Sequence, residues 1–370
     1  MRRYDLDWLR VGVFALLIFY HVGMFFVPWG WHIKNNEIYS WLKWPMLFLN
    51  QWRLPILFVI SGMGTAYALS SRSITEFRWE RLRRLGIPLI FGILCIVPPQ
   101  IYIERIVNHQ FQGSYLSFWP IHMFDNGVYP EGNFSWHHLW FLPYLLVFSL
   151  LLSPLFAYLR AADKGLKAWL KVNLAKRPAM IYLFVFPLFL CESFLEPFFQ
   201  VTHNLVWDWF NFVSSLFLFF FGFLLISLGE VYWVAIRKIW KVAIFIGIFC
   251  FTAQVFIWLY FEDSVIIHFT EAMFKTLNLW SWILALFGFA DRFLNHKSTV
   301  LKYANEAVYP FYILHQTITI LIAYAIYDKH WGLATKGILL VGGTFLFSWL
   351  IYEFLIKRIR FLRPLFGLKS

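Results

Sequence analysis

Ten apolar stretches of helical length dominate this 370-residue chain and restrict it to a fold that crosses a membrane. A spanning helix needs about 20 mainly apolar residues, because it rises about 1.5 Å per residue and the hydrocarbon core is about 30 Å thick. Of all residues, 60% are hydrophobic and only 14% are charged. We therefore predict an all-α, polytopic membrane helix bundle with spans at residues 9–29, 44–70, 84–103, 139–159, 179–198, 210–229, 242–261, 273–290, 306–327 and 335–356.

The basic residues predict how this bundle is oriented. With the N-terminus in the cytosol, the inner segments carry 25 Lys or Arg and the outer segments carry six, and Arg53 lies within a span. Because cytosolic loops collect Lys and Arg, this split places both termini in the cytosol of a multi-pass protein of the inner (plasma) membrane. The net charge of +12 then reflects topology and contact with anionic membrane lipids, and no nucleic-acid partner is expected.

The organisation of the chain is simple. We find no repeat or linker, so residues 1–370 are expected to form a single transmembrane domain. The three cysteines all fall inside expected spans, which indicates neither a disulfide framework nor a Cys-based metal site. The longest outer segment, about residues 104–138, is too short for a separate domain and is expected to cap an outward-facing cavity.

The first span carries polar residues along one side. Arg10 and His21 are eleven residues apart, which is almost three helical turns or about 16 Å along the axis. Asp7 lies on the same stripe and can pair with Arg10. A histidine at membrane depth is costly to bury and therefore indicates function, although a packing role for His21 and an interfacial salt bridge for Asp7 and Arg10 remain open.

Arg53 is the second charged residue at this depth. It lies about 13 Å into the second span, close to the expected depth of His21. A cation beside His21 would favour the neutral imidazole that a general base requires. The alternative is that Arg53 only hydrogen-bonds carbonyls near Pro55. Further along, Gly62 and Gly64 are expected to allow close helix packing.

An arginine cluster precedes the third span. Residues 78–84 contain four arginines, of which Arg81 and Arg84 are three apart and would share one face of an α-helix. Arginine binds phosphate in a bidentate manner, so a phosphorylated cytosolic cofactor could dock there. Ordinary positive-inside charge is the alternative explanation.

Two further histidine segments point to a cavity. His137 and His138 precede the fourth span, and a zinc site is not expected there because adjacent helical residues diverge by about 100° and no carboxylate or cysteine lies at ligand spacing. We expect His138 to contact substrate instead. In the ninth span, Pro310 loosens the helix between Tyr309 and His315, and we expect both of these side chains to line the substrate cavity.

Together these segments resemble the membrane acyltransferase type-3 family over nearly the whole chain. The resemblance rests on Arg10 followed by His21, Arg53-Leu-Pro-Ile-Leu-Phe-Val-Ile-Ser-Gly62, Arg81-x-x-Arg84 with Gly-Ile-Pro88, His138-Leu-Trp-Phe-Leu and Tyr309-Pro-Phe-Tyr-Ile-Leu-His315. The segments at Arg53 and at Gly-Ile-Pro88 most resemble a branch that succinylates periplasmic glucans.

The resemblance implies transfer of an acyl group, acetyl or succinyl, from cytosolic acyl-CoA to an extracytoplasmic carbohydrate or glycan. It implies that His21 is the catalytic histidine, that Arg10 is its motif partner and that Arg81 and Arg84 line the CoA entrance. The imidazole could act as a base or carry the acyl group, and we add Arg53 as a stabiliser of the oxyanion. Acyl-CoA is the expected co-substrate and no metal is expected.

Two other classes of protein remain open. A transporter or exporter of a glycan or lipid-linked sugar could use His21, Arg53 and His315 as its path, although transporters usually show internal symmetry and this chain shows none. A haem- or quinone-binding protein could use His21 and His315 as axial ligands. The sequence leaves the acyl group, the acceptor, a covalent acyl-enzyme, a partner protein and the oligomeric state undetermined.

Overall fold

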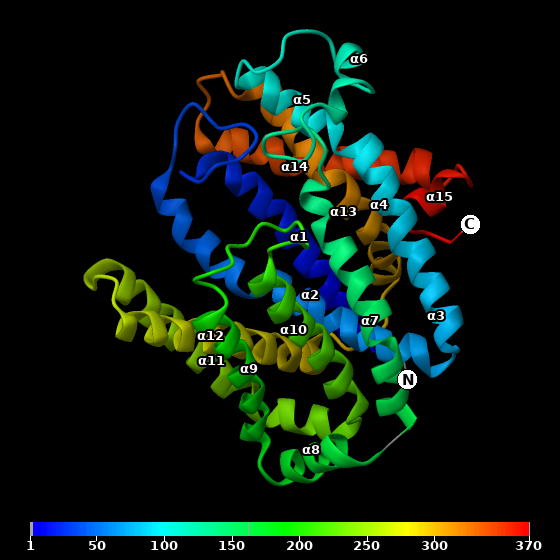
Figure 1. The fold of residues 1–370 in the computed structure, drawn as a ribbon, viewed down its shortest axis with the longest axis vertical. Coiled ribbons are helices and arrows are strands. Elements are labelled where there is room, and N and C mark those ends of the chain that lie inside the picture. Colours follow the sequence, from blue (N-terminus) through cyan, green and yellow to red (C-terminus); the bar gives the residue numbers. More distant parts are fainter. Residues whose placement is uncertain (1–2, 162, 370) are drawn as a thin grey trace. The chain divides into compact units, whose positions relative to one another are not determined.

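The computed structural model describes residues 3–161 and 163–369, and it confirms the all-α prediction for this part of the chain. Among the described residues, nine helical stretches are long and apolar enough to cross a membrane (Figure 1). They are Tyr4–Phe26 (α1), Ser40–Ser70 (η1 and α2), Ile74–Val107 (α3 to α5), His137–Arg160 (η5 and most of α7), Trp209–Ser227 (α10), Glu230–Tyr260 (α11), Val265–Phe293 (α12), Thr299–Ile326 (α13) and Leu333–Ile356 (α14 and η7).

The fifth expected span is shorter than the other nine. It consists of a 3₁₀ helix, η6 (Pro178–Phe184, 7 residues), followed by α9 (Val185–Phe194, 10 residues). A 3₁₀ helix rises about 2.0 Å per residue and an α-helix about 1.5 Å, so the segment reaches about 29 Å. That length is close to the about 30 Å of a hydrocarbon core, so the prediction of ten spans depends on this segment.

Helix ends differ from the expected spans where a helix continues beyond its apolar part. The clearest case is α11, which begins at Glu230 although the expected span begins at residue 242. Its first turns carry Arg237, Lys238 and Lys241, which hydropathy excludes from a span but which an exposed helix accepts. Hydropathy therefore located the apolar part of this helix and not its N-terminal end.

The third span is an interrupted helix. In it, α3 (Ile74–Arg81), α4 (Ile87–Phe91) and α5 (Pro98–Val107) are separated by the π-turns η2 (Leu82–Gly86) and η3 (Gly92–Ile96). Such turns are rare and often lie at functional sites.

The remaining helices are η1 (Ser40–Leu42), α2 (Lys43–Ser70), α6 (Tyr115–Phe118), η4 (His122–Phe124), η5 (His137–Trp140), α7 (Phe141–Ala161), α8 (Gly165–Lys176), α14 (Leu333–Ile351), η7 (Tyr352–Ile356) and α15 (Leu362–Leu365).

The chain divides into two compact units that several helices share. The first unit comprises Met1–Val13, Phe48–Glu80 and Tyr144–Leu301, and the second comprises Phe14–Leu47, Arg81–Pro143 and Lys302–Ser370. Because α1, α2, α7 and α13 each contribute to both units, the units are not consecutive segments of the chain. The single-domain expectation stays a prediction.

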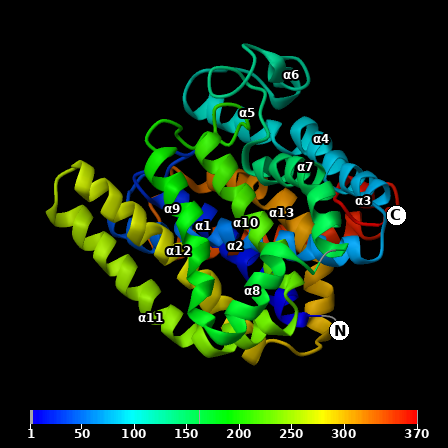
Figure 2. The same cartoon turned by 60° about the horizontal axis from the view of Figure 1, so that its bottom comes forward.

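Packing in the first unit depends on small residues. Figures 1 and 2 show α11 and α12 running side by side as a long helical hairpin. Elsewhere in this unit, a side chain at Gly62 of α2 would collide with the Phe219 carbonyl of α10, and one at Gly222 would collide with the Val59 carbonyl. The expected packing role of Gly62 is therefore confirmed, since only glycine permits this backbone approach.

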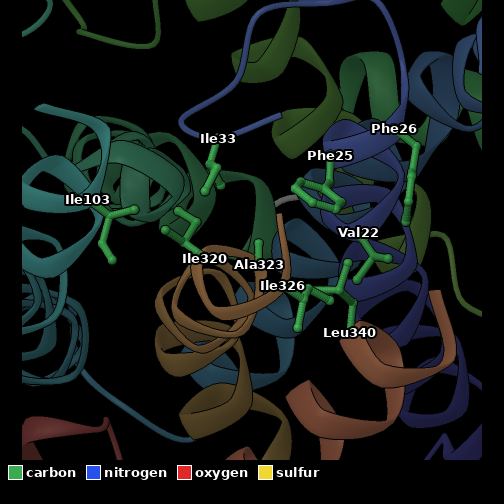
Figure 3. Close-up of a cluster of buried hydrophobic side chains, with 9 residues drawn as sticks. All are labelled: Val22, Phe25, Phe26, Ile33, Ile103, Ile320, Ala323, Ile326 and Leu340. Atoms are coloured by element: carbon green, nitrogen blue, oxygen red, sulfur yellow. The ribbon is translucent and has the colours of Figure 1, made fainter. Parts of the chain in front are cut away.

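The second unit has a hydrophobic cluster beside the polar residues described below. Figure 3 shows Phe25 and Phe26, at the end of α1, near aliphatic side chains of α13 and α14. The complete cluster is Val22, Phe25, Phe26, Ile33, Ile103, Ile320, Ala323, Ile326 and Leu340. Ile33 and Ile103 anchor the connection after α1 and the end of α5 to the same core, so this cluster fixes the elements that carry the candidate site.

Candidate active site

A pair of histidines from distant parts of the chain lies within the second unit. His21 Nδ1 of α1 lies 2.8 Å from His315 Nε2 of α13, and the two ring centroids are 4.9 Å apart. His315 is fully buried, whereas His21 is half-buried. The structure therefore brings together two residues that the sequence singled out separately, and His21 is the more accessible of them.

The hydrogen bonds of this pair determine where its protons lie. His315 Nδ1 is 2.7 Å from the Tyr312 carbonyl oxygen, which can only accept, so this Nδ1 carries the proton. In the neutral ring, His315 Nε2 is then an acceptor, and His21 Nδ1 donates to it. The lone pair of a neutral His21 therefore resides on Nε2, which is the nitrogen that can accept a proton or an acyl group.

His138 is held by the protein on both of its ring nitrogens. Its Nε2 donates to the Ile313 carbonyl at 3.0 Å, and its Nδ1 accepts from Gln100 at 3.3 Å. The His138 carbonyl also accepts from the Tyr312 hydroxyl at 2.7 Å. These bonds dock the start of η5 on α13 and place the ring 5.2 Å from that of His315. The predicted substrate contact of His138 would require one of these bonds to open.

Three neutral polar residues extend this arrangement, and the sequence analysis did not identify them as site residues. Gln100 of α5 donates to the Thr317 hydroxyl at 2.7 Å, and Gln316 donates to the Gln100 side-chain oxygen at 3.0 Å. Gln316 also lies 3.1 Å from His32 Nε2. The sequence did carry a signal for Gln100 and Gln316, because both are amides within apolar spans. Buried amides of this kind usually have hydrogen-bond partners.

Arg84 and Tyr309 meet at another part of the second unit. The Tyr309 hydroxyl donates to the Arg84 carbonyl at 3.0 Å, and Arg81 and Arg84 both act electrostatically on this hydroxyl. The expectation that Arg81 and Arg84 share an α-helical face does not hold as stated, because Arg81 ends α3 while Arg84 lies in the π-turn η2. Both guanidinium groups instead act electrostatically on Tyr309.

The C-terminal segment belongs to the same place. Gly367, with φ of +70°, packs so closely on the Tyr309 ring that a side chain there would overlap it. The Gly367 carbonyl also accepts from Arg84 Nε at 3.4 Å. In the sequence, the basic residues after the last span indicated only topology, because their spacing says nothing about the helix on which they fold.

Aromatic rings connect this arginine region to the histidine pair along α13. Tyr309, Tyr312 and His315 follow at intervals of three residues, with centroid distances of 6.4 and 6.1 Å between successive rings. His21 continues the series from α1 at 4.9 Å from His315. One face of α13 therefore leads from Tyr309, beside Arg84, to His21.

Arg10 lies in the first unit, where it pairs with Asp7 as predicted. The distance from Arg10 Nη2 to Asp7 Oδ1 is 2.8 Å. Both side chains line a cavity of about 340 Å³, together with Arg3, Gly64 and Tyr67. Arg10 therefore faces a space large enough to admit part of a ligand.

Arg53 also belongs to the first unit. It lies on α2, two residues before Pro55, and only 2% of its surface is exposed. A guanidinium this deeply buried requires compensation by partners or by a ligand. Its proposed proximity to His21, a residue of the second unit, stays a prediction.

Comparison with known proteins places the chain in a family. Residues 3–353 match the acyltransferase domain of the acyltransferase 3 family. Proteins named glucans biosynthesis protein C, from Escherichia coli O1:K1, E. coli O45:K1 (strain S88) and E. coli K12, are each 25% identical over 335 residues. The match covers 86% of this chain and 82% of each relative. No solved structure matches the chain significantly.

These findings define a multi-pass membrane protein with a histidine pair among its helices. The chain belongs to the acyltransferase 3 family and is an acyl-group transferase. The family resemblance seen in the sequence is thereby confirmed, and the resemblance to the glucan branch corresponds to a distant similarity of 25% identity.

Proposed function

We propose that this acyltransferase moves an acetyl or succinyl group from cytosolic acyl-CoA to a hydroxyl of an extracytoplasmic carbohydrate, with His21 as its base. The proposal rests chiefly on the 2.8 Å contact between His21 and His315, because the tautomers of this pair leave the basic nitrogen on the more accessible ring. A general base needs a lone pair whose position is fixed in this way.

The proposed reaction moves the acyl group directly from the thioester sulfur to the acceptor oxygen. The acceptor hydroxyl oxygen attacks the thioester carbonyl carbon while His21 Nε2 takes its proton, and the carbon–sulfur bond then breaks. The CoA thiolate leaves and receives a proton, and the His21 imidazolium supplies it. Throughout, His315 Nε2 accepts a hydrogen bond from His21 Nδ1, which keeps the ring oriented in both of its protonation states.

A variant of this scheme proceeds through an acyl-histidine intermediate. In this variant His21 Nε2 attacks the thioester carbonyl first, and the CoA thiolate leaves. The acyl group then moves from nitrogen to the acceptor oxygen in a second step. In either scheme, His315 is a positioning residue rather than the substrate contact that the sequence suggested, because its two nitrogens face Tyr312 and His21.

The donor is proposed to enter beside Arg81, Arg84 and Tyr309. Acyl-CoA carries several phosphate groups, and arginine binds such groups through paired N–H donors. The aromatic series on α13 leads from this position to His21, so a thioester arm could follow this face. Arg10, which lines the cavity of the first unit, is a second candidate contact for the donor.

Arg53 is proposed to stabilise the oxyanion that forms on the thioester carbonyl. A positive group in a dry site lowers the energy of this developing charge far more than it would in water. The near-complete burial of Arg53 supports this role. His138, whose ring is fixed by its hydrogen bonds, is proposed to form part of the surface that binds the acceptor.

The proposal also names an acceptor and a membrane topology. The relatives' name points to glucans, so a glucan hydroxyl is the first acceptor to test. We propose ten spans, with the segment Pro178–Phe194 as the fifth, and therefore both termini in the cytosol of the plasma membrane. This orientation places the basic N-terminal end of the third span on the side that holds acyl-CoA.

The test is turnover by detergent-purified protein with acetyl-CoA or succinyl-CoA and a glucan acceptor, for the wild type and His21→Ala. We expect turnover with one donor and a loss of at least about 10²-fold in kcat for His21→Ala, the typical contribution of a positioned base.

The matched control is His268→Ala, which removes another helical histidine, one whose Nε2 bonds the Ser193 carbonyl at 3.0 Å. It should retain wild-type turnover. Equal activity of His21→Ala and wild type would refute the role of His21. Glycan flux into sealed vesicles without any acyl transfer would instead support the transporter alternative.

A further inference from the structure

We propose that His32, Glu104 and His137 form a binding site for a divalent transition-metal ion, with zinc as the first candidate. These residues lie in three separate elements: the connection after α1, the end of α5 and the start of η5. One ligand atom from each lies within 4.8 Å of the others. The site is separate from the His21–His315 pair and does not depend on the proposed function.

The spacing suits one small ion. Ligand atoms on a common tetrahedral zinc ion, each at about 2.0 to 2.2 Å from it, lie about 3.3 to 3.6 Å apart. Side-chain shifts of about an ångström would therefore complete the site. His32 Nδ1 already contacts Glu104 Oε2, and the ring centroids of His32 and His137 are 4.6 Å apart.

One ligand nitrogen is left unsatisfied by the protein. Within the part of the chain that the structure describes, His137 Nε2 is buried and has no hydrogen-bond partner. Its other nitrogen, Nδ1, lies 3.0 Å from the Ser135 hydroxyl. A metal-bound histidine commonly donates its second N–H to a neighbouring oxygen in this way, so the ring is already held in a ligating orientation.

The carboxylate is supported in a similar manner. The Tyr129 hydroxyl hydrogen-bonds Glu104 and so orients the carboxylate. Gln316 lies 3.1 Å from His32 Nε2, and with its amide turned so that Oε1 faces this nitrogen it would accept the Nε2 proton of a ring that binds the ion through Nδ1. Each of the three ligands therefore has a neighbour that orients it.

The nearest basic residue is occupied elsewhere. Arg105 follows Glu104 directly, and its guanidinium donates to the Pro130 and Gly132 carbonyls at 2.7 and 2.8 Å and to Asn133 at 2.9 Å. It thereby ties down the outer segment that leads to His137. A bound cation would face the carboxylate of Glu104 and two neutral imidazoles.

The ligand set selects the type of metal. Two imidazole nitrogens and one carboxylate suit zinc and related transition metals, whereas Mg²⁺ and Ca²⁺ prefer oxygen ligands. Because the three ligands come from separate elements, a bound ion would cross-link the two outer connections to the end of α5. We infer that its main effect is to stabilise this part of the protein.

The experiment uses the full-length protein in detergent, dialysed against a chelator and titrated with Zn²⁺, and with Co²⁺ as a spectroscopic probe. We expect one equivalent to bind the wild type and to raise its thermal midpoint. His32→Ala, Glu104→Gln and His137→Ala should each weaken binding at least tenfold.

His122→Ala is the matched control, because His122 also lies 2.6 Å from a carboxylate, that of Asp125, but on the exposed surface of the same outer segment. It should bind metal like the wild type. The proposal is overturned if the wild type binds no equivalent, or if the three ligand variants bind as tightly as the control. The titration of the wild type shows whether the protein binds one equivalent of metal, and this result does not depend on the folding of any variant.

Discussion

Each of the two units buries a cluster of polar side chains, but the clusters are built from different chemical groups. In the first unit, Gln51 donates to Gln254 at 2.8 Å and Asn278 donates to Gln51 at 2.6 Å. In the second, the central contact joins the imidazoles of His21 and His315. Amides cannot change protonation near neutral pH, whereas an imidazole can. The first cluster can therefore only hold helices together, and the second can also move a proton.

This difference refines the rule that a polar residue inside a membrane indicates function. Gln254 and Asn278 are fully buried in the first unit, yet the amides of their cluster are satisfied largely by one another. The pair Lys275 and Glu192, which joins α12 to α9, is likewise a local ion pair. Burial alone therefore does not distinguish polar residues that hold the structure together from those that take part in a reaction. The kind of chemical group and its accessibility distinguish them.

The largest expected effect, after that of His21→Ala, is at His315. His315→Leu removes the acceptor for His21 Nδ1, so kcat should fall about 10²-fold, in the range of general-base effects. His315→Gln can still offer a carbonyl oxygen and should retain more activity than the leucine variant. Steady-state kinetics at several pH values measure both. Equal losses in the two variants would show that His315 serves only as packing.

A smaller effect is expected in the arginine region. Arg81→Ala combined with Arg84→Ala should raise the Kd for acyl-CoA about tenfold or more, because phosphate contacts to arginine are charge-assisted. The folded protein should otherwise remain intact, since Arg84 is exposed. Binding is measured by calorimetry with the purified protein.

Arg83→Ala provides the control for this measurement, because Arg83 is an exposed arginine of the same π-turn. Its affinity for acyl-CoA should match that of the wild type. An unchanged affinity of the double variant would refute the docking position.

The amide cluster of the first unit should behave in the opposite way. Gln254→Leu removes the acceptor for the Gln51 amide, which should lower the free energy of unfolding by about 1 kcal/mol, as for other interhelical hydrogen bonds in membranes. Thermal unfolding measures this, and kcat of the folded protein should not change. A large loss of kcat at unchanged stability would contradict the structural role of the cluster.

The smallest effect concerns a loop of the first unit. Burial lowers the pKa of His203 to about 4, while nearby Asp208 opposes this shift. Between about 6.5 and 4 the unfolded chain binds more protons than the folded one, so stability falls as the pH drops through this window. His203→Gln should flatten the pH dependence of the thermal midpoint there. A slope as steep as that of the wild type would assign the pH dependence to other groups.

Much of the architecture was predictable from local sequence. Apolar stretches of about 20 residues located the nine membrane-length helical stretches of the described residues, since hydropathy sums over neighbouring residues. The i to i+3 spacing of Asp7 and Arg10 predicted their ion pair, because spacing within one helix fixes which side chains meet. The π-turn at Leu82–Gly86 escaped prediction, because the α-helical period assumed for Arg81 and Arg84 is interrupted there.

The sequence by itself determined that this protein is an all-α membrane acyltransferase, and it singled out both His21 and His315. Only the tertiary structure decided that these two histidines, 294 positions apart, bond each other, and that Glu104 lies against His32 and His137. The sequence shows no carboxylate at ligand spacing from His137 and His138, because spacing along the chain identifies only neighbours within one helix. A hydrogen bond or metal ligand depends on atoms within about 3 Å, and helix packing alone brings such distant residues that close.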